Sequence, residues 1–348
     1  RGYSSKQDRD NTCKLCQIDH TIVMNDIKIE NKFEILPYIS SSLSGERTKY
    51  YDRVNYATPN LEYGLGVNLD LNKNLSLEAT INPDFSQVEA DETKIDINSP
   101  TAINYPEKRP FFNKGIDAMD YSLDVFNSRA INNPSFAGKI LNQGKKTRLY
   151  ILSAFDEETP YLVPTQYESF SGVGGKSFSN IIRYQNFISS NAHIGVLSSN
   201  RYYEGGAYGN LFGVDALFKI SDIWKFELEY FVNNNKEPIS DWIKSDKTFG
   251  EYTVRLDGEK FNGSALYAEI RRETENWRSF IQYTNLSEGF RSDNGFITGN
   301  DLKKYSFWHS YYQFPNSELL KNYRISLKQE QAPPVAGFFV CGMMCRFG

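Results

Sequence analysis

The sequence predicts an all-β fold, an antiparallel transmembrane β-barrel, closed or partial, with an inserted charged and proline-rich loop. Three observations support this prediction. Aromatic residues make up 15% of the 348 residues although the mean hydropathy is -0.54, a mixture that suits many strands joined by polar loops. Apolar residues recur at every second position in many segments, and short and long connections alternate along the chain.

The clearest alternation lies in residues 61–71, where each odd-numbered residue is apolar and each even-numbered residue is polar or glycine. After a turn at 72–74 the alternation resumes in residues 75–82, which predicts a β-hairpin with a short loop. Residues 211–220 and 225–233 repeat the pattern around a tight turn. Further candidate strands lie at residues 33–43, 148–155, 180–188, 193–200, 251–257, 263–272, 277–286, 304–314 and 322–329.

The predicted connections fall into two classes of length. Short turns lie near Asn72, Gln143, Ser190, Asp222 and Glu275, and they alternate with long segments at 159–177, 234–248 and 289–303. Short turns at one rim and long loops at the other are typical of a transmembrane barrel.

Charged side chains occupy the polar faces of these predicted strands. A basic residue that faces acyl chains costs roughly 2–4 kcal/mol near the bilayer midplane, and an acidic residue costs somewhat less, so we expect the charges to line the lumen. They are Asp70, Glu78, Asp215, Lys219, Glu227 and Glu229. Backbone groups in hydrocarbon must be paired, which favours closure of the sheet.

Outer-membrane lipid is the partner that this pattern implies. A transmembrane helix is not expected, because the chain has no apolar stretch of roughly 18 residues. The net charge of -4 argues against a nucleic-acid partner, which usually requires a basic surface. No pattern in the sequence sets the oligomeric state.

The chain is expected to comprise three parts: a lead-in at residues 1–27, the barrel at 28–331 with an inserted segment at 83–115, and an atypical tail at 332–348. It opens at Arg1 without a signal peptide, so we expect a mature or trimmed portion of a longer protein. The tail is interpreted as a native end, a truncation or an altered reading frame. The cysteine pairs, Cys13 with Cys16 and Cys341 with Cys345, favour isolated thiols or local disulfides over a zinc site.

The inserted segment lacks both strand and helix periodicity and contains two motifs, NPDFSQVEAD at residues 82–91 and YPEKRPFFNKG at 105–115. These motifs resemble the family catalogued as domain of unknown function 5916, which comprises outer-membrane barrels that carry a module like the family 9 carbohydrate-binding modules. FEILPY at 33–38 and GVDALFKISD at 213–222 are weaker points of likeness. The sequence departs from the family at Lys114, where the family has Glu, and the module is absent from it.

The resemblance implies an outer-membrane location in a Gram-negative bacterium and an association with carbohydrate, mostly through the module. It implies no established activity, so the chain is expected to be a binding or uptake protein rather than an enzyme. Two alternatives stand beside this function. One is a surface glycoside hydrolase that uses carboxylates of the inserted segment, and the other is a structural membrane anchor for the carbohydrate-binding module.

The inserted segment supplies most of the candidate site residues. Glycoside hydrolysis needs two carboxylates roughly 5–10 Å apart, for which Glu89, Asp91 and Glu107 are the candidates. Asp84 and Arg109 are candidate ligand-binding residues. The alternative is a folded-in constriction in which Arg109 pairs with Glu107 or Glu89 across the lumen.

A calcium site is the third interpretation of this segment, because carboxylate oxygens are the ligands that calcium prefers. Its candidate ligands are Asp84, Glu89, Asp91 and Glu92, which do not follow the EF-hand spacing. No other metal or cofactor is expected.

Aromatic residues on the predicted rims form a second group of candidates. Tyr202 and Trp242 belong either to the interfacial girdle of a barrel or to a sugar-stacking site. His20, His193 and His309 fit no catalytic or zinc motif and are expected to pack or lie at a rim. The glycine-rich GVGGK at residues 172–176 is interpreted as a loop.

Overall fold

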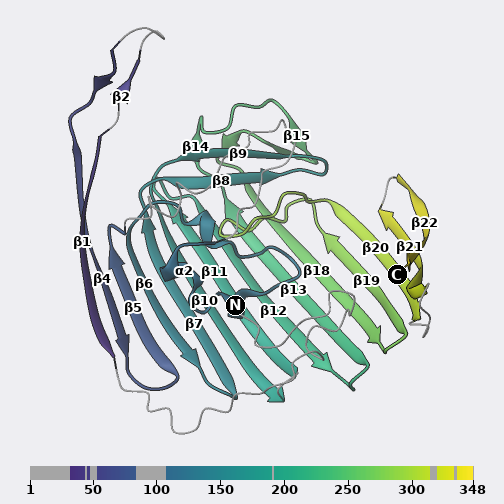
Figure 1. Ribbon diagram of the computed structural model, residues 1–348. Coiled ribbons are helices and arrows are strands. Elements are labelled where there is room, and N and C mark those ends of the chain that lie inside the picture. Colours follow the sequence, from purple (N-terminus) through teal and green to yellow (C-terminus); the bar gives the residue numbers. More distant parts are fainter. Residues whose placement is uncertain are drawn as a thin grey trace.

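The computed structural model describes residues 32–43, 45–47, 53–83, 107–189, 192–313, 320–332 and 335–347. Within these ranges one antiparallel sheet of 14 strands runs in chain order from β1 to β22, and both of these are edge strands (Figure 1). The predicted all-β antiparallel fold is confirmed. The strands of this sheet are β1 (Phe33–Ser42), β4 (Asn60–Asp70), β5 (Leu75–Ile81), β6 (Pro134–Gln143), β7 (Thr147–Asp156), β10 (Ser177–Ser189), β11 (Ala192–Tyr203), β12 (Tyr208–Lys219), β13 (Trp224–Lys236), β18 (Lys260–Glu273), β19 (Trp277–Leu286), β20 (Leu302–Gln313), β21 (Leu320–Ala332) and β22 (Val335–Phe347).

The connections follow the predicted pattern of short turns at one rim and long segments at the other (Figure 1), except that residues 204–207 make a short connection between two strands at the long rim. The predicted turn at Ser190 is outside the described residues. The long rim carries small antiparallel pairs. Three of them form a cap above the sheet, and they are β8 (Thr159–Pro164) with β9 (Ser169–Gly174), β14 (Ile239–Ser240) with β17 (Leu256–Asp257), and β15 (Thr248–Phe249) with β16 (Tyr252–Thr253). The fourth pair, β2 (Gly45–Glu46) with β3 (Asn55–Tyr56), lies apart from the cap at the end of the extended β1–β4 hairpin (Figure 1).

Three segments differ from the sequence prediction. Residues 251–257 are not a strand of the large sheet, because they contribute only the two-residue strands β16 and β17 to the cap. The loop predicted at 159–177 is largely the β8–β9 hairpin, which includes the first glycines of GVGGK. Residues 335–347 of the expected tail form β22, which pairs with β21 and extends the sheet.

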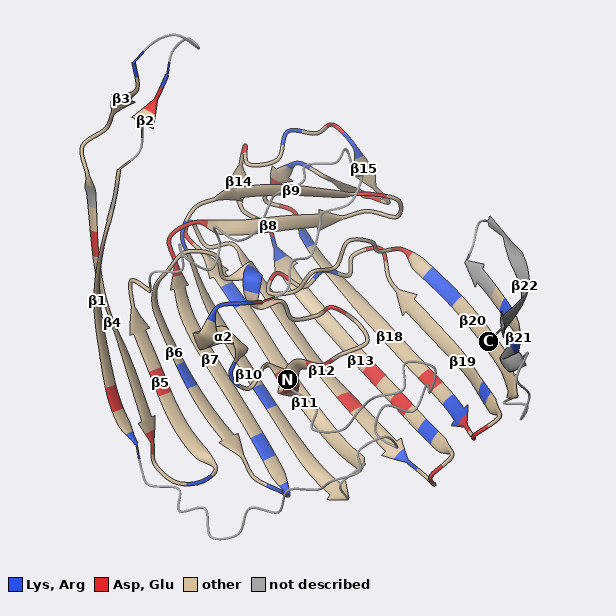
Figure 2. Cartoon of the chain, in the orientation of Figure 1, with Lys and Arg blue, Asp and Glu red and all other residues tan. Residues whose placement is uncertain are grey.

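The two faces of the sheet have an inverted polarity. Val214 on β12 is 39% exposed, whereas its neighbour Asp215 on the opposite face is 7% exposed. Figure 2 shows charged bands within strands such as β5, β6, β10 and β13, away from the strand ends. The outward side is apolar and exposed at Ile182, Tyr184, Ile194, Val196, Phe212, Val214, Tyr230, Val232, Ile270 and Ile281.

An aromatic row crosses the outward face near the long rim. Cross-strand pairing places Phe136, Phe155, Phe178, Tyr202 and Tyr208 next to one another on five consecutive strands. The rings of Phe155 and Phe178 lie 4.6 Å apart. From Phe178 to the exposed end of β10 the strand runs about ten residues, which is roughly 25 Å of height for a strand tilted by about 40°.

The inward face packs on residues 107–133, which we call the inner segment, and on residues 287–301, which we call the inner loop. The inner segment contains α2 (Pro110–Asn113), η2 (Ile116–Met119) and η3 (Ser128–Ala130). Its apolar side chains join those of the sheet in one core. The core includes Phe112, Val125 and Ile131 of the inner segment, Leu152, Ile181, Leu197 and Phe231 of the sheet, and Phe290 of the inner loop.

Candidate functional site

The EKRPFF motif forms a compact knot at the start of the inner segment. The Arg109 guanidinium binds the Glu107 carboxylate through two bonds, Nε to Oε1 at 2.9 Å and Nη2 to Oε2 at 2.7 Å. Ser128 Oγ donates to the same carboxylate at 2.6 Å, and Arg109 Nη1 donates to the Ile131 carbonyl at 2.7 Å. Arg109 thus pairs with Glu107, one of its two expected partners, but the pair is local in sequence and does not cross the lumen. It joins both ends of the inner segment.

Helix α2 begins directly after this knot because Pro110 occupies its first turn, where no backbone N–H is needed. The Phe112 ring is fully buried and lies 4.2 Å below the Arg109 guanidinium. Burial acts to raise the pKa of Glu107, but the hydrogen bonds and charge of Arg109 outweigh it, so this pKa is lowered. Glu107 therefore stays ionised and is a poor general acid.

Buried cations of the sheet donate hydrogen bonds to backbone carbonyls of the inner segment. Lys139 on β6 contacts the Phe111 carbonyl and lies 3.0 Å from that of Lys114. Arg183 Nε on β10 donates to the Ala118 carbonyl at 3.1 Å. Arg201 Nη2 on β11 donates to the Ala130 carbonyl at 2.7 Å.

Buried carboxylates of the sheet accept hydrogen bonds from backbone N–H groups of the same segment. Glu229 on β13 accepts from Ser122 at 2.6 Å and from Leu123 at 3.1 Å. Asp156 on β7 accepts from the N–H groups of residues 132 and 133, at 2.9 Å and 2.6 Å. Charges of both signs thus hold the inner segment along its length.

The inner loop covers the inner segment from the long rim. The backbone N–H of Asn127 donates to the Asn294 carbonyl at 2.7 Å, and Ser292 Oγ donates to the Val125 carbonyl at 2.6 Å. Asn294 also binds the sheet, because it accepts from Ser179 Oγ at 2.8 Å. The inner segment is therefore bonded on two sides.

The cap contains a pocket of about 300 Å³ beside Trp242. The Trp242 indole lies across the backbone of Gly174 and Gly175, where a Cβ on Gly175 would meet the ring at 2.6 Å. Lys176, Glu204 and Lys236 also line the pocket, and within the described ranges no ion pair involves Lys236. A half-buried indole with polar groups of both signs is an arrangement that suits a hydroxylated ligand.

A buried charge cluster supports the base of the cap. Arg291 of the inner loop donates to Tyr161 Oη at 2.8 Å and lies 3.6 Å from the Glu237 carboxylate. Burial raises the pKa of Glu237 to about 7, which Arg291 opposes and nearby carboxylates reinforce. Glu237, Asp257 and Glu259 bring carboxylate oxygens within 4.8 Å of one another, a donor set that suits a hard cation.

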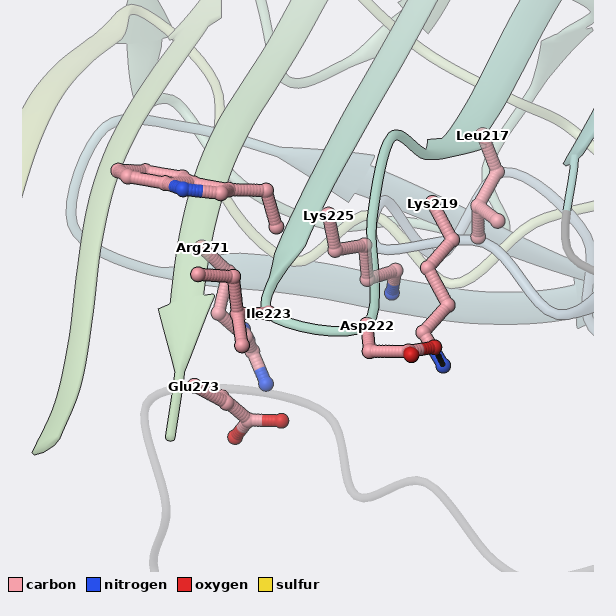
Figure 3. Close-up of a pocket in the computed structure, with 8 residues that line it drawn as sticks. Leu217, Lys219, Asp222, Ile223, Lys225, Arg271 and Glu273 are labelled. Carbon is pink, nitrogen blue, oxygen red and sulfur yellow. Dashed lines mark ion pairs between the residues drawn. The ribbon is translucent and has the colours of Figure 1, made fainter. Parts of the chain in front are cut away.

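A smaller pocket of about 280 Å³ lies at the short rim, where Figure 3 shows Lys219, Lys225 and Arg271 around the ends of β12, β13 and β18. Each cation already has a carboxylate partner. Lys219 lies 3.6 Å from Asp222, while Lys225 and Arg271 lie 2.7 Å and 2.8 Å from Glu227 and Glu269. This pairing leaves little net charge to attract an anion.

The structure brings together only part of the predicted site. Asp84, Glu89, Asp91 and Glu92 lie outside the described residues, so the hydrolase and calcium hypotheses stay predictions. Glu107 and Arg109 meet in the knot. Tyr202 lies in the outward aromatic row at 48% exposure, a position that favours the girdle interpretation, whereas Trp242 lies in the cap.

The histidines that the structure describes have local partners. His193 Nε2 lies 3.3 Å from the Asp215 carboxylate, and His309 Nδ1 lies 2.6 Å from Ser279 Oγ. His20 is outside the described residues. The buried cations Lys139, Arg183 and Arg201 are not among the predicted site residues. Arg183 and Arg201 occupy inward positions of strands whose alternation is visible in the sequence, whereas Lys139 lies in β6, where apolar residues on both faces hide the alternation.

Comparison with known proteins is consistent with this architecture. Residues 31–148 match the family model described as "Domain of unknown function (DUF5916)". The sequence matches no curated protein. No helix in the described part of the chain has the length and apolar character needed to cross a membrane.

Two solved structures of Gram-negative outer-membrane proteins are similar to this chain. The outer membrane channel DcaP of Acinetobacter baumannii shares 13% identity over 90% of this chain and 97% of that chain, with a TM-score of 0.32. Wzi of Escherichia coli, described as a carbohydrate binding beta-barrel involved in group 1 capsule assembly, shares 9% identity over 88% and 82%, with a TM-score of 0.20. At such TM-scores neither likeness indicates what this chain binds. The strand order and inverted polarity define a large antiparallel sheet of the outer-membrane barrel type with a filled interior.

We expect Arg109→Met to lower the free energy of unfolding by roughly 3–5 kcal/mol, because it leaves the buried Glu107 carboxylate without its cation. Arg148→Met is the matched control. It breaks the exposed pair with Asp117 and should cost about 1 kcal/mol or less. Urea unfolding of the purified protein in detergent, followed by tryptophan fluorescence, measures both. Equal losses would contradict a structural role for the knot.

Proposed function

We propose that this protein is an outer-membrane β-barrel protein of a Gram-negative bacterium, with a filled interior, that binds carbohydrate on its long-loop side. The inverted polarity of the sheet carries this proposal. Soluble proteins rarely expose a continuous apolar band while burying charges such as Arg183 and Glu229 on the opposite face. In a bilayer that distribution is the stable one.

The outward dimensions support a membrane setting. The aromatic row marks one interface, and the apolar stretch below it is close to the roughly 25 Å band that such barrels present to lipid. Short turns face the periplasm in barrels of this class, so the cap and its pocket would face the outside of the cell.

The Trp242 pocket supports carbohydrate as the ligand. Its volume of about 300 Å³ suits a small saccharide, whose C–H faces stack on an indole while its hydroxyls bind charged side chains. The match of residues 31–148 is to the family whose motifs the inserted segment resembles. The association with carbohydrate is what that resemblance implies, so it supports the proposal only indirectly.

Binding is favoured over free passage because the inner segment occupies the interior. Its backbone is bonded to cations and carboxylates on at least five strands, from β6 to β13. A solute could pass only if many of these bonds broke together. Uptake would therefore require that a partner protein or an energy-consuming process displace the inner segment.

The membrane part of the proposal is tested by fractionation of the full-length protein combined with a detergent gel. We expect the protein in the outer-membrane fraction, with a band that migrates differently before and after boiling because the sheet resists detergent until heated. A soluble protein with no heat-induced shift would overturn the proposal.

The carbohydrate part is tested on a glycan array with purified protein in detergent. We expect Trp242→Ala to lower affinity for the bound glycan by a few-fold to about tenfold, since stacking on one aromatic ring contributes roughly 0.5–1.5 kcal/mol. Lys236→Gln should weaken binding without disturbing the packing of the cap. Tyr167→Ala is the control, because Tyr167 is an exposed aromatic residue of the cap outside the pocket.

Absence of any glycan signal from the wild type would refute carbohydrate binding. Equal losses in Trp242→Ala and Tyr167→Ala would remove the Trp242 pocket as the site.

A further inference from the structure

A further cavity lies on the inward side of the sheet, between helix α2 and strands β1, β4 and β5, and its volume is about 670 Å³. We call it the α2 chamber. Pro110 and Phe111 of α2 form one side, and the opposite side is the sheet. Neither the family match nor the similar structures assign a ligand to this position.

The sheet side of the chamber is open because of a glycine. Leu36, Gly66 and Thr80 lie directly opposite one another on β1, β4 and β5. A Cβ built on Gly66 would meet only Leu36, at 3.6 Å, so this position has free space above it. Gly64 differs, because the Tyr38 ring already fills the space above it. Of these two glycines of β4, only Gly66 therefore has free space on its chamber side.

The charges around the chamber are balanced. Glu78 pairs with Lys139 at 2.8 Å and also with Lys114, which lies 3.8 Å from Asp70. Two cations therefore face two carboxylates at one end of the chamber. This balance favours a neutral ligand over an anion or a cation.

The remaining lining combines polar groups and ring surfaces with the aliphatic residues Leu36, Ile39 and Ala79. Ser40 and Thr80 offer hydroxyls, and Asn68 offers an amide. Phe111 and Pro110 offer apolar surface on the facing side. Hydroxyls and amides that donate and accept, opposite a ring face, match a sugar ring. The volume of the α2 chamber also lies within the usual range of small-molecule sites, roughly 300–1,000 Å³.

We propose that the α2 chamber binds a neutral mono- or disaccharide, as a second site distinct from the Trp242 pocket. The proposal rests on the proposed carbohydrate function and gives that function an interior site. Its position between the sheet and the inner segment places a ligand beside the contacts of Lys139 and Lys114 that hold α2.

The test fills the chamber without altering its charges. Gly66→Leu places a side chain in the vacant space, and Gly138→Leu is the matched control. Gly138 also lies within a strand, faces outward, and would have its nearest Cβ contact at the same 3.6 Å. Thr80→Val removes one hydroxyl at nearly constant volume. Heat-shifted migration on a detergent gel checks that each variant folds.

The probes are glucose, galactose, mannose and N-acetylglucosamine, measured by saturation-transfer NMR on the full chain in detergent. We expect at least one probe to bind the wild type, Gly138→Leu and Trp242→Ala. The chamber variants are measured in a Trp242→Ala background, which removes the contribution of the cap pocket. There, binding should fall at least about tenfold when Gly66→Leu is added and several-fold when Thr80→Val is added.

Retention of binding in Gly66→Leu, with loss in Trp242→Ala, would overturn the chamber site and leave the proposed function intact. A glycan-array signal without binding of any of the four probes would likewise overturn the chamber site and leave the proposed function intact. Failure of both the array and the probes would overturn both proposals. A phospholipid retained by the wild type in native mass spectrometry and lost from Gly66→Leu would also overturn the saccharide assignment.

Discussion

The rest of the structure depends on how the inward charges of the sheet are compensated. Asp215 and Glu229 lie directly opposite each other on β12 and β13, an arrangement of like charges that destabilises a bare sheet. Arg183 pairs with Asp215, while Glu229 is bound by two backbone N–H groups of the inner segment. Without the inner segment the Glu229 carboxylate would lose both of these backbone partners and would face Asp215 uncompensated. The inner segment therefore completes the sheet electrostatically.

This compensation explains why an irregular segment can occupy the interior. A loop within a core has backbone groups that need partners, and burying one unpaired costs roughly 1–3 kcal/mol. Here long side chains of the sheet reach those groups, with cations at carbonyls and carboxylates at N–H groups. The Glu107–Arg109 knot bonds the start of the inner segment to its end, so the segment forms a closed loop inside the sheet. The two pockets that could take a ligand lie beside this filled interior, one in the cap and one next to α2.

The sequence predicts the parts of the fold that depend on local patterns. Alternation in residues 61–71 and 75–82 corresponds to β4 and β5 because a sheet with one apolar face requires that period. Pairing of Arg109 with Glu107 was also predictable, since the two residues are close in sequence. Strand β6 was missed because its inward Ala137 and Leu141 are as apolar as its outward Phe136 and Ile140, which hides the alternation.

The long-range contacts of the site leave no comparable pattern. Carbonyl partners of Arg183 and Arg201 are backbone atoms, which any residue can provide, so no sequence motif marks them. The fit of Trp242 on Gly174 and Gly175 joins segments nearly 70 residues apart in sequence. Glycines in GVGGK are typical of a loop, and only the fold indicates that an indole needs the space above them.

The claim that sheet charges hold the inner segment is tested most directly by hydrogen exchange of its backbone amides. The amides of Ser122 and Leu123, and those of residues 132 and 133, donate to buried carboxylates. In the folded protein in detergent they should be protected as strongly as the amides of β10 and β11. Exchange as fast as in the exposed cap residues 244–247 would show that the inner segment is not held by the sheet, and would contradict the filled interior.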